Sequence, residues 1–571
     1  MDECAHRGGE PAGAGDLKSL MALATAHRRA GRLPAAEELY AKIIAAWPTA
    51  AEPRRRLGIL CAESGRGDEA IAHLAAAQRL VPDNPAYLTD LGHAYFAADR
   101  LAEAADAYGQ ALALRPDFAA AHFSLGNLLR REGKLLEAAA AYRRAIAAHA
   151  GIAGFHVNLG VTLHELSHFD EAIAVLRQAV ALDVRSVEVH YNLAVVLAAQ
   201  RRLDEAIQSY RTALAIDPRS ASLYLNLGAA LQEQDKRGEA KLCFARAIEL
   251  DPNLAQPHLN LGAVLYEEGA FDAALAEIRK GLLLAPGHAV SYVNLAQTFQ
   301  AMGDFPAAET AFRKALELEP TLTAAKAHWS TALQQLGKWE EALTLLDYEH
   351  LLKQRRLARV PAWATVADFN AELARYICRH PTLMRDPPGR ATQHGSQTME
   401  LLNCADAPVA ALQRFIEESV AEYFATLPQS TSPWAPRAPQ AWRLHGWAVV
   451  LRASGYQIPH FHPEAVVSGV YYVQIPGVVT AGNTGEAGFI KFGPPVAGTS
   501  AAQAADRPVA RALRPEPGMI VLFPSYYWHH TIPFEGSEDR ICVAFDVVAD
   551  EQARTRGPAR EALSQSGLAK S

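Results

Sequence analysis

Histidines and an arginine near the C-terminal end of the chain have the types and spacing of a metal site with an anion anchor. His460 and His462 lie in the stretch PHFHP, directly before the apolar run SGVYYV. Because alternate residues of an extended strand share a face, these two side chains can converge on one ion. The pair His529-His530 follows about 70 residues later, and a third histidine completes a facial set with open positions for substrate and oxygen. Arg540, about ten residues further on, offers a forked cation that suits a carboxylate.

Short β-rich runs surround these residues and must position them. Each run is bounded by Gly, Pro or polar turn residues, which is typical of an antiparallel sandwich or barrel. The runs cover residues 442–451, 466–475, 488–492, 519–523 and 541–548. Helical patterns at 369–380 and 409–427 and a proline-rich stretch at 428–439 precede them. We therefore expect a β domain at residues 366–550, with its core at about 440–548.

This part of the chain resembles the double-stranded β-helix 2-oxoglutarate/Fe(II) oxygenases. The match lies in PHFHP, SGVYYV, FPS, the segment from His529 to Pro533, and Arg540, over about residues 440–548, with weaker similarity near 392–402. It is closest to a bacterial branch that is often fused to tetratricopeptide repeats. The resemblance implies a jelly-roll fold, Fe(II), and 2-oxoglutarate as cosubstrate. It places His460 and His529, rather than His530, at metal-ligand positions and Arg540 on the distal carboxylate of 2-oxoglutarate.

One position departs from the pattern of these oxygenases. Most of them place an aspartate or glutamate two residues after the first histidine, where this chain has His462. Three arrangements remain open: His460, His462 and His529 all bind the metal; Glu464 supplies a carboxylate, although Pro463 constrains the backbone between; or two histidines bind alone. We favour the set of three histidines.

The N-terminal half carries a strict repeat of 34 residues. Nine leucines follow one another at this step: Leu23, Leu57, Leu91, Leu125, Leu159, Leu193, Leu227, Leu261 and Leu295. An alanine keeps it from Ala36 to Ala342. A fixed period of this length indicates stacked repeats, in which each unit packs on its neighbours.

One unit, residues 221–254, shows the design. Two helical patterns flank a polar break, and Gly228 and Ala240 are small, so we expect the two helices to approach closely there. Prolines end most units, at Pro48, Pro82, Pro116, Pro218, Pro252, Pro286 and Pro320, whereas Ala150 and Val184 fill this slot in two units and predict more continuous junctions.

The pattern resembles the tetratricopeptide repeat. We expect about ten repeats in a superhelix at residues 16–350, the last with Trp329 in the leucine slot as a capping repeat. A linker or capping helix would follow at 351–365, and a flexible tail at 551–571.

Five consecutive repeats place asparagine before the leucine, at Asn158, Asn192, Asn226, Asn260 and Asn294. Asparagine is a mediocre helix former, so packing alone gives little reason for it. Resemblance to the asparagine-ladder superhelices of protein glycosyltransferases implies a concave groove whose amides bind a protein or peptide partner through its backbone. The alternative is that each asparagine bonds the neighbouring repeat and only holds the curvature.

Composition and charge limit the partners and the cellular compartment that we expect. The net charge of −7 over 571 residues points neither to nucleic acid nor to an anionic membrane. The six cysteines form no C-x-x-C pair, which fits a reducing compartment. With no signal pattern and no long apolar run, we expect a cytoplasmic protein.

Two functions from different classes follow. The first is a 2-oxoglutarate- and Fe(II)-dependent dioxygenase that hydroxylates a protein or peptide side chain held by the repeat groove. The second is a non-catalytic interaction scaffold with a degenerate or metal-sensing domain, which the missing carboxylate favours. A weaker third keeps the oxygenase and replaces the peptide by a small molecule or sugar.

Overall fold

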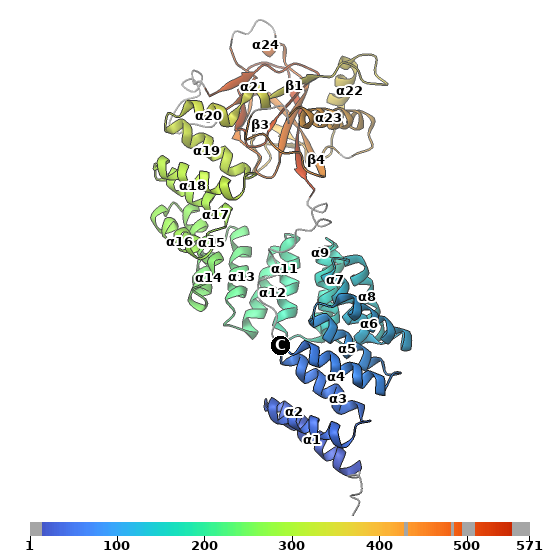
Figure 1. The fold of residues 1–571 in the computed structure, drawn as a ribbon. Helices are drawn as coiled ribbons and strands as arrows, with labels where there is room; N and C mark the ends of the chain where they lie inside the picture. The colour runs from blue at the N-terminus through green and yellow to red at the C-terminus, as the bar shows by residue number, and fades with distance from the viewer. Residues whose placement is uncertain (1–13, 403, 428–431, 481–484, 494–508, 551–571) are drawn as a thin grey trace, which may run out of the picture. The chain divides into compact units, whose positions relative to one another are not determined.

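The computed structural model describes residues 14–402, 404–427, 432–480, 485–493 and 509–550. They fall into two compact units that divide between Pro252 and Asn253. The described residues of the first unit form helix pairs, and the second unit holds further pairs and a large antiparallel sheet (Figure 1). The predicted class, a helical solenoid followed by a β jelly roll, is confirmed. The borders at 350, 365 and 550 stay predictions, and the tail at 551–571 lies outside the described residues.

The first unit alternates first and second helices of successive repeats. The first helices are α1 (Ala14–Arg29), α3 (Ala51–Glu63), α5 (Pro85–Ala97), α7 (Ala119–Arg131), α9 (Ala153–Glu165), α11 (Val187–Ala199) and α13 (Ala221–Glu233). The second helices are α2 (Leu33–Ala46), α4 (Gly67–Leu80), α6 (Leu101–Leu114), α8 (Leu135–Ala148), α10 (Phe169–Leu182), α12 (Leu203–Ile216) and α14 (Arg237–Leu250). From α3 to α11 each first helix contacts the next first helix, and described second helices make no comparable contact with each other. The first helices therefore form the inner side of the stack.

Small residues allow the two helices of a repeat to approach each other closely. A Cβ added at Gly228 would lie 2.6 Å from the Phe244 ring, so no larger residue fits between α13 and α14. Ala240 is fully buried. The close approach expected at these two positions is confirmed.

Proline marks the ends of repeats but is not required for them. α12 ends at Ile216, two residues before Pro218. The prediction of continuous junctions at Ala150 and Val184 is wrong, because α8 and α10 end at the same point of the repeat as α12. His149 after α8 and Asp217 after α12 both leave the helical region, with φ −153° and −122°. Packing of the next repeat is enough to end these helices.

The second unit begins with three more pairs. They are α15 (Ala255–Glu267) with α16 (Phe271–Leu284), α17 (Ala289–Ala301) with α18 (Phe305–Leu318), and α19 (Thr323–Gln335) with α20 (Trp339–Leu346). The last pair packs on the β domain instead of ending the stack as a free cap: Trp329 lies edge-on to Trp434, with ring centroids 5.2 Å apart. Tyr526 donates its hydroxyl hydrogen to the Leu345 carbonyl at 3.0 Å. The last repeats and the β domain share one hydrophobic core.

The sheet is antiparallel throughout. Its strands are β1 (Lys353–Arg356), β2 (Met384–Arg385), β3 (Thr392–Gln397), β4 (Trp442–His460), β5 (Val467–Gln474), β6 (Ile490–Phe492), β7 (Arg511–Leu513), β8 (Met519–Pro524), β9 (His529–Thr531) and β10 (Arg540–Ala549). Their order is β1-β8-β5-β10-β4-β9-β6-β7, and β3 pairs with both β2 and β4.

The long strand β4 carries the site because it changes partners. It pairs with β10 from Trp442 to Leu451 and with β9 at its far end, where His460 lies opposite His529. Between these regions Ser454 has a φ of 62°, and a Cβ on Gly455 would lie 2.8 Å from the Arg452 carbonyl oxygen. Such an irregularity bends a strand and increases its twist. The bend brings the end of β4 to β9.

The remaining helices are α21 (Tyr348–Leu351), α22 (Val366–Cys378), α23 (Ala407–Thr426) and α24 (Gly477–Thr480). Residues 353–356, expected in a linker or capping helix, instead form β1, which pairs with β8. Its sequence, KQRR, is charged because β1 lies at an edge of the sheet, where charge discourages further pairing. No helix in the described part of the chain is long and apolar enough to cross a membrane.

Candidate metal centre and peptide-binding face

Three histidines meet at one end of the sheet. One ring nitrogen from each of His460, His462 and His529 lies within 4.8 Å of the others, and among the described residues no other set of His, Cys, Asp and Glu meets this condition. Two ligands at roughly 2.1 Å from one ion are at most about 4.2 Å apart, so a small closing movement would let all three bind. Glu464 is exposed and outside the cluster. The geometry thus favours the arrangement with three histidines over the one with Glu464.

Each of these histidines is oriented by its Nδ1 atom. Nδ1 of His460 donates to the Ile458 carbonyl at 2.7 Å, and Nδ1 of His529 donates to the Tyr527 carbonyl at 3.0 Å. Nδ1 of His462 lies 2.6 and 2.7 Å from the carboxylate oxygens of Asp546. Since a carbonyl oxygen only accepts, the Nδ1 atoms of His460 and His529 carry the proton and their Nε2 atoms are left as acceptors. This is the tautomer that metal-binding histidines adopt.

The local electrostatics keep two of the rings neutral. Burial, with the neighbouring His462 adding to it, lowers the pKa of His460 to about 4. Burial also holds the pKa of His529 well below its usual range, with His460 and His462 contributing. A histidine must be neutral to bind a metal, so both are ready ligands near pH 7.

His462 is held in the cluster by the loop around it rather than by a strand. β4 ends at His460, and the His462 N–H donates to the Ser525 carbonyl at 3.0 Å. The Ser525 hydroxyl donates to the Ala465 carbonyl. The FPS stretch therefore positions the third histidine.

Asp546 is a residue that the sequence analysis missed. It accepts from His462 and, at 2.6 Å, from the Ser468 hydroxyl. The signal was available: Asp546 lies six residues after Arg540 on the same strand, and even offsets share a face. The carboxylate that the usual pattern places on the metal is here one layer further out, behind His462.

Arg540 is a buried cation without a carboxylate partner among the described residues. Only 1% of its surface is exposed. Its Nε donates to the Gly488 carbonyl at 3.2 Å, and Nη1 lies 3.6 Å from Cys542 Sγ, both weak partners for a charge. Buried charges are normally paired, so this guanidinium suits an anionic ligand.

Tyr472 contributes to the same pocket. Its ring centroid lies 5.2 Å from the Arg540 guanidinium carbon, and its buried hydroxyl has no hydrogen-bond partner among the described residues. Tyr471 points to the opposite side, where its hydroxyl donates to Asn370 of α22 at 2.7 Å.

Family models match both parts of the chain. Residues 445–546 match the family described as "Putative 2OG-Fe(II) oxygenase". Residues 21–85 and 289–322 match tetratricopeptide-repeat models, and residues 84–291 match the C-terminal domain of cilia and flagella-associated protein 70. The chain carries tetratricopeptide repeats and a C-terminal 2-oxoglutarate/Fe(II) oxygenase domain. No curated protein matches it.

Several solved structures of repeat proteins resemble part of the chain. YrrB, a TPR protein with an unusual peptide-binding site, is 24% identical over 33% of this chain and 96% of its own, with a TM-score of 0.29. MamA is 27% identical over 28% of this chain and 95% of its own, with a TM-score of 0.27. A Parabacteroides merdae tetratricopeptide repeat protein is 19% identical over 44% of this chain and 98% of its own, with a TM-score of 0.37.

The residues of the oxygenase domain fit the iron and cosubstrate that the family implies. His462 Nε2 is buried and lacks a hydrogen-bond partner among the described residues, and Arg540 lacks a counter-charge there. Both line one small cavity with His460, His529 and Tyr472. The free space between these side chains is about 20 Å³, room for roughly one water molecule, so a cosubstrate must displace side chains on entry.

His530 and His445 lie outside the metal cluster. His530 faces away from it, opposite Lys491 in the pairing of β9 with β6. His445 bonds Glu400 at 3.1 Å and is exposed, as befits a structural histidine. The choice of His529 over His530 therefore agrees with the geometry.

The predicted asparagine ladder lies on first helices and is half-buried throughout. We call the position before each repeat leucine the rung. Asn158 donates to Asn127 of the preceding repeat at 3.0 Å. Asn192 and Asn226 donate instead to carbonyls of their own helices, those of Glu188 and Ser222, at 2.9 and 2.8 Å. The alternative role, bonding the neighbouring repeat, thus describes Asn158 alone among these three.

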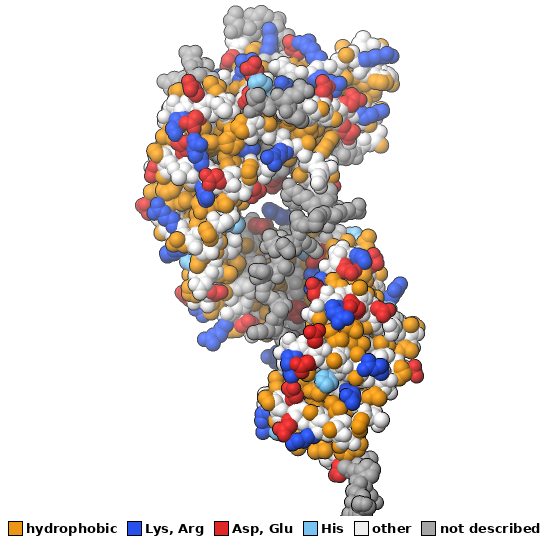
Figure 2. Space-filling view, in the orientation of Figure 1, with side chains coloured by type: hydrophobic (Ala, Val, Ile, Leu, Met, Phe, Trp, Pro, Cys, Tyr) orange, Lys and Arg blue, Asp and Glu red, His pale blue; other side chains and the backbone are white. Residues whose placement is uncertain are grey.

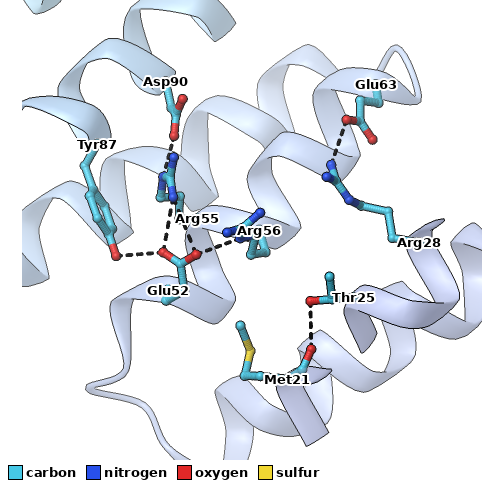
Figure 3. A network of polar contacts seen from close by, with 9 residues as sticks. All are labelled: Met21, Thr25, Arg28, Glu52, Arg55, Arg56, Glu63, Tyr87 and Asp90. Atoms are coloured by element: carbon cyan, nitrogen blue, oxygen red, sulfur yellow. Dashed lines mark hydrogen bonds and ion pairs between the residues drawn. The ribbon is translucent and has the colours of Figure 1, made fainter. Parts of the chain in front are cut away.

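Two rungs of earlier repeats, Arg56 and Asp90, are charged and paired. Figure 3 shows Arg55 in an ion pair with the rung residue Asp90, and the rung residue Arg56 bonded to Glu52 at 2.6 Å. Tyr87 donates its hydroxyl hydrogen to the same Glu52 at 3.0 Å. On the face seen in Figure 2, cationic and anionic side chains are interspersed without a large patch of one sign.

The last rung contacts the oxygenase domain. It is His328 of α19, one period after Asn294. The ring of His328 lies 5.4 Å from Phe461 and 5.7 Å from Trp528, centroid to centroid. Phe461 separates His460 from His462, and Trp528 precedes His529. Trp528 Nε1 also donates to the Ala327 carbonyl at 3.0 Å. The last repeat therefore packs against the segments that carry all three candidate ligands.

Proposed function

We propose that the chain is a 2-oxoglutarate- and Fe(II)-dependent dioxygenase that hydroxylates a side chain of a protein or peptide held by the repeats. The observation that carries this proposal is the pairing of two features in one cavity. Three histidine nitrogens are free to bind a metal, and a buried arginine has no carboxylate partner among the described residues. A scaffold with a degenerate domain has no need of an unpaired buried cation, which is costly to keep.

Each residue of the cavity would have its own role. His460, His462 and His529 would hold Fe(II), with Asp546 fixing the orientation of His462. Arg540 would bind the distal carboxylate of 2-oxoglutarate. The bound iron and cosubstrate supply, with O₂, the oxidising power to convert a C–H bond to C–OH, while 2-oxoglutarate is converted to succinate and CO₂. The chain supplies placement in a small cavity lined by the three histidines, Tyr472 and Arg540.

The repeats make a polypeptide the favoured substrate. Tetratricopeptide repeats are generally protein-interaction modules, and the last repeat packs beside the metal-ligand segments. The predicted asparagine ladder is the proposed contact with the partner. A cytoplasmic location remains a prediction from the cysteine pattern.

The proposal is tested by measuring the transfer of an oxygen atom from O₂ to protein. The full chain, Fe(II) and 2-oxoglutarate are incubated under ¹⁸O₂ with a denatured protein extract, and peptides are examined by mass spectrometry. We expect particular peptides to gain one ¹⁸O atom in step with succinate formation, and no labelling with a His529→Ala chain. Labelling of small molecules alone would support the third function instead.

A shorter chain separates the role of the repeats from that of the cluster. It should start at Asn253 rather than after residue 350, because α19 and α20 belong to the core of the oxygenase domain. We expect this fragment to bind Fe(II) and 2-oxoglutarate like the full chain but to label protein more slowly. Equal labelling rates would exclude a role for residues 1–252 in substrate capture.

A further inference from the structure

Two lysines are buried in the described part of the chain, and one of them has no counter-charge there. Lys491 is 6% exposed and pairs with Glu486 at 3.0 Å. Lys326 of α19 is 7% exposed, and among the described residues its ammonium makes no hydrogen bond and no ion pair. A buried charge is costly unless it is paired, so Lys326 suits an anion that comes from outside the chain.

Lys326 occupies a position that is neutral in the earlier repeats. The position lies two residues before the rung, and in three repeats it holds a histidine whose Nε2 bonds the carbonyl six residues earlier. These histidines are His122, His156 and His190, with distances of 2.8, 3.0 and 2.9 Å. In the last repeat the same position holds a lysine, and its side chain makes no such bond. Packing within the repeat therefore does not account for the cation.

The ammonium of Lys326 lies against an aromatic ring next to the metal-ligand segments. Nζ is 5.2 Å from the ring centroid of Tyr526, a contact that stabilises the charge but uses none of its three N–H donors as a hydrogen bond. The ring is fixed, because its hydroxyl donates to the Leu345 carbonyl at 3.0 Å. Tyr526 directly follows Ser525, whose carbonyl accepts from the His462 N–H. The cation thus lies beside the loop that positions a candidate metal ligand.

Arg437 brings a second positive charge to Lys326. It is exposed, and it has no ion pair among the described residues. Its segment is held on the last repeat by Trp434, which lies edge-on to Trp329. Burial, with the charge of Arg437 adding to it, lowers the pKa of Lys326 to about 8, so the ammonium is still the main form at pH 7. Two cations that act on each other without an anion between them favour binding of a negative group.

We propose that Lys326 and Arg437 bind a carboxylate of the polypeptide substrate, the side chain of an aspartate or glutamate. Both cations can donate charge-assisted hydrogen bonds to one carboxylate, and the guanidinium fork suits its two oxygens. This deepens the proposed function and rests on it only for the claim that the carboxylate belongs to the substrate. Since Lys326 lies on the loop between β8 and β9, the site would select an acidic residue close in sequence to the hydroxylated one.

The test compares two labelled peptide pools on the full chain. Both contain twelve-residue peptides of random neutral sequence with an uncharged dye, and they differ only in a central glutamate or glutamine. Fluorescence anisotropy should show at least about tenfold tighter binding of the glutamate pool, because hydrogen bonds between charged groups are roughly twice as strong as neutral ones. Displacement of the glutamate pool by an equal concentration of succinate would overturn the assignment to a polypeptide.

Variants assign the preference to these two cations. Lys326→Met keeps the length of the side chain without its charge and should reduce the preference for glutamate to less than about twofold. Arg437→Gln should reduce it in part. Lys280→Met removes an exposed lysine of α16 and is the matched control, which should keep the full preference.

A readout on the wild type guards against a variant that does not fold. Acetylation of Lys326, followed by mass spectrometry, should be slowed by the glutamate pool and not by the glutamine pool, while acetylation of Lys280 stays the same. Equal binding of the two pools, no binding of either, or a full preference in a folded Lys326→Met chain would each overturn the inference. The Fe(II)–2-oxoglutarate chelate of the wild type forms without peptide, so its formation beside such a result would leave the oxygenase intact.

Discussion

Replacement of Arg540 by alanine should abolish useful binding of 2-oxoglutarate while leaving the metal site in place. Arg540 is buried, and its visible partners are a carbonyl at 3.2 Å and a sulfur at 3.6 Å. Two charge-assisted hydrogen bonds to a carboxylate are worth roughly 1.5–3 kcal/mol each, so the dissociation constant of 2-oxoglutarate should rise about 10²- to 10⁴-fold. Succinate formation should fall in parallel at fixed cosubstrate concentration.

Two further variants test whether the lost affinity comes from the Arg540 guanidinium itself. Arg540→Lys keeps the charge but loses the planar fork, so its affinity should lie between those of the wild type and the alanine variant. Arg452, an exposed arginine on β4, provides a matched control whose removal should change little. Metal binding, followed by the fluorescence of Trp447 stacked 5.7 Å from His462, reports that the cavity is folded. Unchanged 2-oxoglutarate affinity in a folded Arg540→Ala chain would remove this residue from the site.

Loss of His462 should weaken metal binding on the order of 100-fold. A structural metal site of four ligands binds with roughly 10–16 kcal/mol, about 3 kcal/mol for each ligand. Asp546→Asn should weaken binding about 10- to 100-fold, because the carboxylate orients His462 without touching the metal. Titration of each apo variant with Fe(II) under anaerobic conditions measures both effects.

The adjacent His530 is the matched control for the histidine cluster. It lies on β9 beside His529 but faces Lys491, so His530→Ala should change the metal affinity by less than about twofold. If His462→Ala bound Fe(II) as tightly as the wild type, the site would be one of two histidines. The missing carboxylate would then leave the domain without a third metal ligand, which favours the scaffold function.

The repeats could be predicted almost entirely from the sequence because each of their contacts recurs every 34 residues. Gly228 and Ala240 are small for the reason the period suggested. What failed was the use of proline as the sign of a helix end, since the repeats around Ala150 and Val184 end their helices by packing. The contact of His328 with Phe461 and Trp528 was also missed, although His328 continues the rung period.

The candidate site was predicted in composition more than in geometry. The residue types and their order predicted that His460, His462 and His529 come together. The alternation of side chains along a strand does not explain the position of His462, because His462 lies beyond the end of β4. The position of His462 depends on the Ser525 carbonyl and on Asp546, which lie about 60 and 84 residues further along the chain. Long-range contacts of this kind leave no local pattern in a single sequence.

The most direct test of the account is the visible charge-transfer band of the Fe(II)–2-oxoglutarate chelate. The full chain is purified without oxygen, Fe(II) and 2-oxoglutarate are added, and the spectrum is compared with those of the His529→Ala and His530→Ala variants. We expect a band in the wild type and in His530→Ala and no band in His529→Ala. A folded, Fe(II)-loaded wild type without the band would contradict it and favour a metal-sensing scaffold.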